Sequence, residues 1–201
     1  MIKAIFFDLC GVIITLGDEE FCKELGDVIG RDADLVLNKF YKYLKGNEIG
    51  DYTEDDLYKK MFKDLEVRYD LEKTKDMRTK HRVRMEGMFE LAKDLKNKDY
   101  IVGYISNDAK EMAARCNKKY NLESLFTPEM GILAYQAGAR KDNPKLWKYV
   151  LDKVGLKPEE CIFMDDKEKN LTEAKKANFN TIHFKNRRQL IKELNRLGVK
   201  I

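Results

Sequence analysis

Residues 5–14 of this chain read IFFDLCGVII, and this stretch decides the fold. The chain is almost entirely apolar from residue 2 to residue 7, which predicts a short strand buried on both faces. Asp8 ends the run, and a carboxylate at that point is costly unless a charged group meets it. Gly11 lets the backbone turn tightly and approach a ligand. Taken alone, Asp8 is as well explained by a helix cap or turn residue as by a functional carboxylate, so its role depends on the rest of the chain.

Length and composition indicate a globular protein. The 201 residues suffice for one large domain, or for one domain with a modest insertion. The 39 basic and 35 acidic residues are interspersed and leave a net charge of +4, which is typical of a solvated surface. No apolar run is long enough to span a bilayer, and Asp8 interrupts the first apolar run, so no signal peptide is recognisable. We therefore expect a cytoplasmic protein without a membrane partner.

The chain has four cysteines without any CxxC spacing: Cys10, Cys22, Cys116 and Cys161. A disulfide framework or a zinc site is therefore not expected. Reduced thiols, as in a cytosol, fit this pattern better.

The segment 16–84 differs in character from the first strand. It is rich in charged residues and carries apolar residues such as Phe40 and Leu44 at helical spacing. It predicts three or four helices and no strand, inserted between the first strand and the rest of a sheet. Residues 46–50, GNEIG, are interpreted as a loop between two helices, and Thr53 as the start of the next helix.

The end of this segment carries a run of basic residues: Arg78, Lys80, His81, Arg82 and Arg84. We interpret the run as a solvated helix face, which at most steers anionic substrates towards a cleft. It lacks the interleaved aromatic residues of nucleic-acid-binding surfaces, so we expect no nucleic-acid partner.

From about residue 85 onward, strands and helices alternate. Strands are expected at residues 100–105, 161–164 and 181–184, with short or irregular ones near 126 and at 131–133. Helices are expected at residues 88–95, at 109–120 with Asp108 as the N-cap, at 144–154, after 166 to about 177, and from 187 onward. Strands separated by helices of this length predict a parallel sheet with helices on both faces, an α/β Rossmann-like fold. The core domain then comprises residues 1–15 and 85–201.

Polar residues follow three of the expected strands. Asp8 follows the first, Ser106 and Asn107 follow the second, and Asp165 and Asp166 follow a later one. Parallel strands bring these ends to one edge of the sheet, where ligands bind. Carboxylates that converge repel each other unless a cation joins them, and hard oxygen ligands suit Mg²⁺.

Two further residue types at this edge suit a phosphate group. The Ser106 hydroxyl, with the Asn107 N–H at a helix start, suits phosphate binding. Lys141 lies in a loop before a helix, where it would neutralise a phosphate and steady a nucleophilic carboxylate. Each residue also has a plain structural explanation, Ser106 and Asp166 as caps and Lys141 as a surface lysine. Their joint placement weakens those explanations.

Together these features resemble the haloacid dehalogenase (HAD) superfamily, in the branch whose helical cap domain is inserted after the first strand. Four motifs match in order: residues 7–12 (FDLCGV), residues 105–107 (ISN), Arg140-Lys141, and Asp165-Asp166 with Asn170. The resemblance covers essentially the whole chain and implies that residues 16–84 form the cap domain.

The resemblance implies a Mg²⁺-dependent phosphatase acting on a small phosphorylated metabolite. It makes Asp8 the covalent nucleophile, Ser106 a phosphate-binding residue, and Lys141 the brace of nucleophile and phosphate. Asp165 and Asp166 would hold Mg²⁺ together with Asp8 and the backbone carbonyl of residue 10, which is Cys10 here. Asn107 would join Ser106 and Lys141 in binding the substrate.

Cys10 departs from the family pattern, which has an acid–base Asp at this position. A thiol, with a reference pKa of about 8.5, is a poor substitute for a carboxyl group. General acid–base help is typically worth about 10²–10⁴-fold, so alkyl phosphates should react slowly. The catalytic residues expected from sequence are therefore Asp8 and Lys141, with Cys10 in an impaired role or simply filling space.

Two alternatives to the phosphatase stay open. A catalytically impaired relative would bind a phospho-ligand or a protein, which Cys10 favours. A 2-haloacid dehalogenase would tolerate Cys10, but the pair Asp165-Asp166 is metal-binding in character. The sequence gives neither the substrate nor the oligomeric state, although Tyr41, Tyr43, Lys45 and Tyr52 are candidates to reach the cleft.

Overall fold

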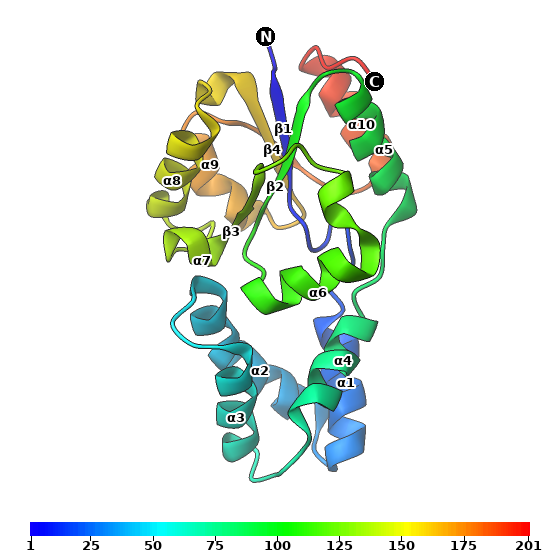
Figure 1. Cartoon of the computed structure of the whole chain (residues 1–201), viewed down its shortest axis with the longest axis vertical. Helices are drawn as coiled ribbons and strands as arrows, with labels where there is room; N and C mark the ends of the chain where they lie inside the picture. The colour runs from blue at the N-terminus through cyan, green and yellow to red at the C-terminus, as the bar shows by residue number, and fades with distance from the viewer.

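A five-stranded parallel sheet forms the core of the computed structural model, which describes residues 1–201 (Figure 1). The strand order is β3-β2-β1-β4-β5, so β1 lies at the centre and pairs with β2 and β4. The strands are β1 (Ala4–Phe7), β2 (Ile101–Ser106), β3 (Gly131–Leu133), β4 (Cys161–Asp165) and β5 (Asn180–His183). The predicted parallel sheet is confirmed, with a first strand that begins at Ala4 rather than at residue 2.

Helices cover both faces of this sheet, which confirms the predicted Rossmann-like architecture. Ile5 and Phe7 point to one face and Ala4 and Phe6 to the other, as the alternation of a strand requires. The first face is covered by α5 (Glu86–Asn97), α6 (Lys110–Tyr120) and α10 (Arg187–Arg196). The second face is covered by α7 (Ala134–Ala137), α8 (Pro144–Val154) and α9 (Thr172–Lys176). Three 3₁₀ turns complete the core: η1 (Leu122–Ser124), η2 (Pro158–Glu160) and η3 (Glu168–Leu171).

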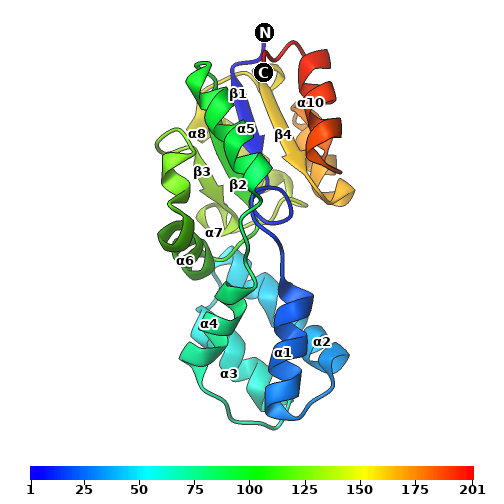
Figure 2. The ribbon, with the colours of Figure 1, turned by 90° about the vertical axis from the view of Figure 1, so that its right-hand side faces the viewer.

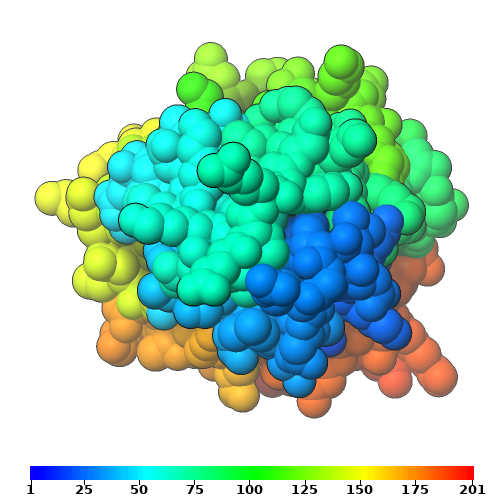
Figure 3. All heavy atoms as spheres, turned by 90° about the horizontal axis from the view of Figure 1, so that it is seen from below, coloured from blue at the N-terminus to red at the C-terminus, as the bar shows by residue number.

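Four further helices lie beyond the carboxyl ends of the strands (Figures 1 and 2). We call them the cap helices: α1 (Asp18–Ile29), α2 (Ala33–Ile49), α3 (Glu54–Asp64) and α4 (Leu71–Lys80). They enclose a hydrophobic cluster of their own, in which the Phe21 and Phe40 rings pack edge to face. Seen from the cap side, the atoms of these helices cover the centre of the molecule (Figure 3).

The two chain segments that join the cap helices to the core run side by side. The Thr15 N–H donates to the Val83 carbonyl at 2.8 Å, and the Thr15 hydroxyl donates to the His81 carbonyl at 2.9 Å. Gly17, at φ +63°, lies so close to His81 that a Cβ would overlap the His81 carbonyl. The cap helices therefore connect to the core through one narrow double strand of chain.

The expected loop at residues 46–50 is wrong, because α2 continues to Ile49. Gly50 ends the helix in the left-handed region at φ +84°, as expected for a glycine C-cap. The Asn47 and Glu48 side chains are both buried. Tertiary packing of these side chains outweighs the turn preference of the Gly-Asn pair.

The two expected helix starts have different outcomes. Thr53 begins α3 with a capping box that includes Asp56, so that prediction is confirmed. Asp108 is not the N-cap of α6, because that helix begins at Lys110 after Ala109. The Asp108 carboxylate instead accepts a hydrogen bond from Cys10, far along the sequence. None of the helices is both long and apolar enough to cross a bilayer.

Candidate active site

The structure brings the polar strand ends together at one edge of the sheet. Asp8 directly follows β1, Ser106 ends β2 and Asp165 ends β4, and none of the three is more than 5% exposed. The Asp8 N–H donates to the Met164 carbonyl at 2.7 Å, so the sheet ladder itself fixes the backbone of Asp8.

Lys141 ties two of these carboxylates together. Its Nζ lies 2.6 Å from Asp8 Oδ1 and 2.7 Å from Asp165 Oδ2, and its side chain is 1% exposed. The explanation of Lys141 as a surface lysine is therefore wrong. Burial lowers the pKa of Lys141, but the charges of Asp165 and Asp8 outweigh burial and raise that pKa above its ordinary value.

Neighbouring residues hold the Lys141 backbone in place. The Lys141 N–H donates to Asn107 Oδ1 at 3.0 Å, and its carbonyl accepts from Trp147 Nε1 at 2.9 Å. The Asn107 side chain thus positions the lysine loop. The expected placement of the Asn107 N–H at a helix start is wrong, because α6 begins only at Lys110. The Ser106 hydroxyl accepts a hydrogen bond from the Asp108 N–H at 3.1 Å and lines the same cavity.

Three carboxylates at this edge form a candidate cation site. One oxygen from each of Asp8, Asp165 and Asp166 lies within 4.8 Å of the others. Asp165 accepts hydrogen bonds from Asn170 Nδ2 at 3.0 and 3.1 Å and from the Lys167 N–H at 2.8 Å. Asp166 Oδ1 is buried without any hydrogen-bond partner. An all-oxygen set with one unsatisfied atom fits a hard divalent cation such as Mg²⁺.

Gly11 allows this arrangement. Its backbone has φ +98°, and a Cβ there would lie 2.5 Å from Asp166 Cγ. Only glycine therefore lets the chain after β1 pass so close to the Asp166 carboxylate.

Burial also changes the protonation of the carboxylates. It raises the pKa of Asp8 to about 8, although the Lys141 charge lowers that pKa, and the Asp165 charge adds to the increase. Burial and the Asp165 charge likewise raise the pKa of Asp166. The cluster therefore retains protons near neutral pH, as expected where carboxylates outnumber cations.

Cys10 is 8% exposed, and its Sγ donates to Asp108 Oδ2 at 3.4 Å. Burial raises the pKa of the Cys10 thiol well above its ordinary value. The residue is therefore a neutral hydrogen-bond donor at neutral pH, and the thiolate is strongly disfavoured. All four cysteines are free, as predicted.

The basic run at the end of the cap helices is not a solvated face throughout. Arg78 and Arg82 are each 1% exposed. Arg82 Nη2 donates to Asp18 Oδ1 at 3.1 Å and lies 3.8 Å from Asp108 Oδ1, while Arg78 Nη2 lies 4.0 Å from the same Asp108 oxygen. These arginines link the cap helices to the core, because one carboxylate partner, Asp18, lies on α1 and the other, Asp108, follows β2. Buried guanidinium groups need such partners, and the fold supplies them.

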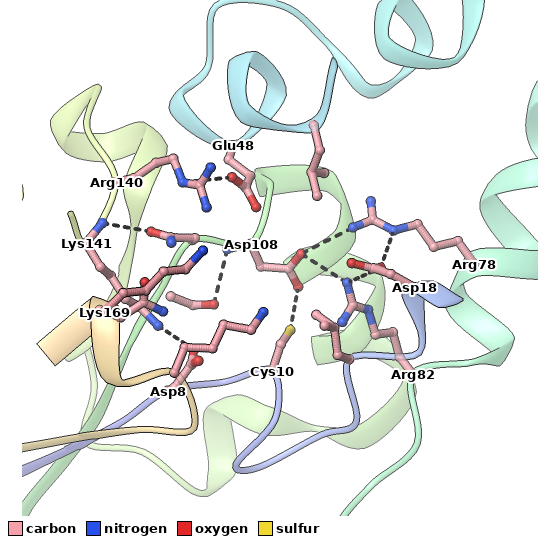
Figure 4. A pocket seen from close by; sticks show the side chains of 16 residues that line it. Asp8, Cys10, Asp18, Glu48, Arg78, Arg82, Asp108, Arg140, Lys141 and Lys169 are labelled. Atoms are coloured by element: carbon pink, nitrogen blue, oxygen red, sulfur yellow. Dashed lines mark hydrogen bonds and ion pairs between the residues drawn. The ribbon is translucent and has the colours of Figure 1, made fainter. Parts of the chain in front are cut away.

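A cavity lies between the carboxylates and the cap helices (Figure 4). This inner cavity encloses about 70 Å³. Three of its 16 lining residues are hydrophobic, so it suits a small polar group such as a phosphate. An outer cavity of about 320 Å³ opens beside it, lined in part by Tyr41 and Lys45. Seven residues line both cavities: Leu16, Asp18, Leu44, Glu48, Arg140, Lys167 and Lys169.

Two of the four expected cleft residues do not reach these cavities. The Tyr43 hydroxyl donates to Asp64 at 2.9 Å, and the Tyr52 hydroxyl donates to the Tyr43 carbonyl, so both bonds lie within residues 16–84. Sequence reasoning missed Asp18 and Glu48 as lining residues. Neither differs in local sequence from the many other acidic residues of the segment.

The sequence model of the family described as haloacid dehalogenase-like hydrolase matches residues 25–184. The chain belongs to this family. Ser106, Lys141, Asp165 and Asp166 lie within the matched residues, and Asp8 lies before them.

Two curated proteins align with this chain, one over most of its length and the other over about a third of it. A D-ribitol-5-phosphate phosphatase from Bacteroides thetaiotaomicron is 26% identical over 202 residues, which covers 92% of this chain and 93% of that protein. A flavin mononucleotide hydrolase from Arabidopsis thaliana is 34% identical over 65 residues, which covers 32% of this chain and 26% of that protein. The curated relatives are therefore hydrolases, and this chain is a hydrolase of the same family.

The fold comparison agrees with the family assignment. A HAD-family enzyme from Bacteroides thetaiotaomicron, solved with magnesium and inorganic phosphate, superposes with a TM-score of 0.77. The alignment covers 94% of this chain and 99% of that one at 22% sequence identity. At this identity the likeness establishes the shared fold.

Proposed function

We propose that this protein is a Mg²⁺-dependent phosphatase that acts on a small phosphorylated metabolite through an aspartyl-phosphate on Asp8. The observation that carries the proposal is the double contact of Lys141 Nζ with Asp8 and Asp165, beside the unpartnered oxygen of Asp166. One cation among three carboxylates leaves an excess of negative charge in a buried space. A divalent cation would neutralise that excess.

Each residue has a role in this proposal. The Asp8 carboxylate attacks phosphorus, while Lys141 holds that carboxylate and offsets the charge of the phosphoryl oxygens. The Ser106 hydroxyl binds the phosphate, and Asn107 orients the lysine loop. Asp8, Asp165, Asp166 and the carbonyl of Cys10 would hold Mg²⁺. When bound, Mg²⁺ would supply charge stabilisation to the phosphoryl oxygens.

The size and lining of the two cavities support a small, polar substrate. The inner cavity of about 70 Å³ suits the phosphoryl group, and the outer cavity suits the rest of the molecule. The relative that acts on D-ribitol 5-phosphate agrees with a compact polar substrate. We propose residues 1–15 and 85–201 as the core domain and residues 16–84 as the cap domain, which contributes Glu48 and Tyr41 to the cavities.

A catalytically impaired, phospho-ligand-binding protein is the second candidate, and Cys10 is the observation that favours it. A dehalogenase has less support, because displacement of halide by Asp8 would leave the carboxylate of Asp166 without a role. The phosphatase proposal also implies slow turnover of alkyl phosphates, since the Cys10 thiol is a poor proton donor.

Release of phosphate from p-nitrophenyl phosphate tests the proposal, measured with Mg²⁺ and with a chelator. The native protein should turn over only with Mg²⁺, and Asp8→Asn should abolish turnover because the amide is not a nucleophile. Turnover that survives Asp8→Asn would exclude the aspartyl-phosphate route. Absence of turnover in the native protein, with retained phosphate binding, would favour the binding protein.

A further inference from the structure

We propose that Glu48, in the last turn of α2, donates the proton to the leaving group in place of the acid that Cys10 does not supply. This inference rests on the phosphatase function proposed above. It assigns a catalytic role to a residue of the cap helices that lies outside the four family motifs.

Glu48 lies at the junction of the two cavities, where the phosphorus–oxygen bond of a bound phosphate ester would lie. It lines both the inner cavity, which suits the phosphoryl group, and the outer cavity, which suits the rest of the substrate. The ester oxygen joins these two parts of any phosphate monoester. A substrate seated in both cavities therefore places that oxygen near Glu48.

Glu48 also lies on the correct side of the phosphoryl group. Figure 4 shows its carboxylate across the cavity from Asp8. In phosphoryl transfer the attacking and leaving oxygens are roughly in line, so a group attacked by Asp8 expels its leaving oxygen away from Asp8. A proton donor opposite the nucleophile is placed to meet that oxygen.

The Glu48 carboxylate is available for proton transfer. Its side chain is 10% exposed, and Oε2 has no hydrogen-bond partner. Arg140 Nε lies 3.1 Å from this oxygen, but not in hydrogen-bond alignment. Burial raises the pKa of Glu48 to about 7, against the lowering effect of Arg140. An acid with such a pKa is half protonated near neutral pH, and Arg140 would stabilise the carboxylate after the proton has left.

Charged groups from several elements face Glu48 and belong to any account of its titration. They are Arg140 before α8, Asp108 before α6, Arg78 on α4, Asp18 on α1, and Lys167 and Lys169 after β4. Arg140 and Arg78 lower the pKa of Glu48, whereas Asp108 and Asp18 raise it. Burial of the carboxyl group is the largest single effect on this pKa.

Apart from Asp8, the other carboxylates that line the inner cavity are Asp18 and Asp108, and both accept hydrogen bonds. Asp18 Oδ1 accepts from Arg82 at 3.1 Å and lies 3.5 Å from Arg78 Nε. Asp108 Oδ2 accepts from Cys10, and its Oδ1 lies within 4.0 Å of both arginines. Glu48 differs from both because its carboxylate accepts no hydrogen bond, although its Oε2 pairs with Arg140 at 3.1 Å.

The proton balance closes over two steps. In the first, Asp8 forms a bond to phosphorus, the bond from phosphorus to the ester oxygen breaks, and protonated Glu48 gives its proton to that oxygen. In the second, water attacks the aspartyl-phosphate, and the Glu48 carboxylate takes the water proton. The bond from phosphorus to Asp8 then breaks, which releases phosphate and restores both residues.

Leaving-group dependence of kcat/KM tests the inference, because kcat/KM reports the first step. Phenyl phosphate needs a proton donor more than p-nitrophenyl phosphate does, since phenol is a weaker acid than p-nitrophenol. We expect Glu48→Gln to lower kcat/KM about 100-fold for phenyl phosphate and less than about tenfold for p-nitrophenyl phosphate. An equal loss for both substrates, or no loss for phenyl phosphate, overturns the inference.

The pH profile gives a second readout that a merely structural role would not change. At saturating Mg²⁺, native kcat/KM for phenyl phosphate should fall as the pH rises through about 7, where Glu48 loses its proton. Glu48→Gln should lack this fall, and Glu48→Asp should retain it at reduced activity. Persistence of the same fall in Glu48→Gln overturns the inference.

Two further variants complete the design. Glu72→Gln makes the same change on an exposed cap carboxylate, 79% exposed on α4, and should leave both substrates at native values. Cys10→Asp in the Glu48→Gln background should restore phenyl phosphate turnover, which also shows that Glu48→Gln folds. If Asp8→Asn retains turnover, the phosphatase proposal itself fails. If only the selectivity of Glu48→Gln is absent, the role of Glu48 fails alone.

Discussion

Cys10 Sγ donates a hydrogen bond to Asp108 Oδ2 across 3.4 Å and joins the loop after β1 to the loop after β2. The partners are 98 positions apart in sequence. Asp108 also lies 3.8 Å from Arg82, which extends the contact into the buried ion pairs of the cap helices. Cys10 is therefore a neutral hydrogen-bond donor that links the two loops through the Asp108 side chain.

Cys10→Asp should lower the stability of the protein and raise its activity. A carboxylate at this position would meet the Asp108 carboxylate in a buried space, so we expect the free energy of unfolding at pH 7 to fall by about 1–3 kcal/mol. The new acid would lie beside the nucleophile, so kcat/KM for phenyl phosphate should rise by about tenfold or more. Urea denaturation and phosphate release measure the two effects.

The double variant Cys10→Asp with Asp108→Asn is the control for this prediction. It removes the facing charge and should recover most of the lost stability. Cys10→Ser, which keeps a neutral donor, should stay near native stability. A Cys10→Asp protein as stable as the native one would show that the two positions do not interact.

Lys141→Met should destabilise the metal-free protein at pH 8 by about 3–5 kcal/mol, because it leaves Asp8 and Asp165 buried without their cation. The cost should shrink at pH 6, where Asp8, with its raised pKa, takes up a proton. Saturating Mg²⁺ should also reduce the cost. Urea denaturation at both pH values checks this, and Lys148→Met on the exposed face of α8 is the matched control. An equal cost at both pH values would contradict the expected protonation.

Gly11→Ala should weaken Mg²⁺ binding. The new Cβ would lie 2.5 Å from Asp166 Cγ, so the carboxylate must move away from Asp8 and Asp165. We expect a loss of about 10–100-fold in affinity, by analogy with changes that misorient metal ligands. Gly30→Ala is the control, because Gly30 also has a positive φ of +66° but no neighbour within 4 Å. Calorimetric titration with Mg²⁺ measures both, and native affinity in Gly11→Ala would exclude Asp166 from the site.

The sequence was sufficient for the part of the site that lies at the strand ends. Asp8, Ser106 and Asp165 each follow a short apolar run, and a parallel sheet leaves only one edge at which such residues meet. Lys141 was identified through its motif, since nothing in its local sequence distinguishes a buried lysine from a surface one. Its burial depends on two carboxylates from distant strands.

The parts that sequence did not predict depend on partners far along the chain. Arg78 and Arg82 look like members of a solvated basic run, and only the fold brings Asp18 and Asp108 to them. Glu48 lies in a stretch with turn preference, and its burial follows from the packing of α2 against the core. Local patterns contain no information on such contacts, because the compensating charge lies on another element.

Mg²⁺ binding should strengthen as the pH rises from 6 to 8. Asp8 has a pKa raised to about 8, and Asp166 has a raised pKa as well, so the metal-free site holds protons that Mg²⁺ must displace. The same shift means that the metal-free folded state binds more protons than the unfolded state between pH 3.8 and about 8, so Asp8 lowers stability as the pH rises through that range. Calorimetric titration in two buffers of different ionisation enthalpy detects the released protons. Asp8→Asn should show a smaller pH dependence, and equal affinity of the native protein at pH 6 and 8 would contradict the raised pKa.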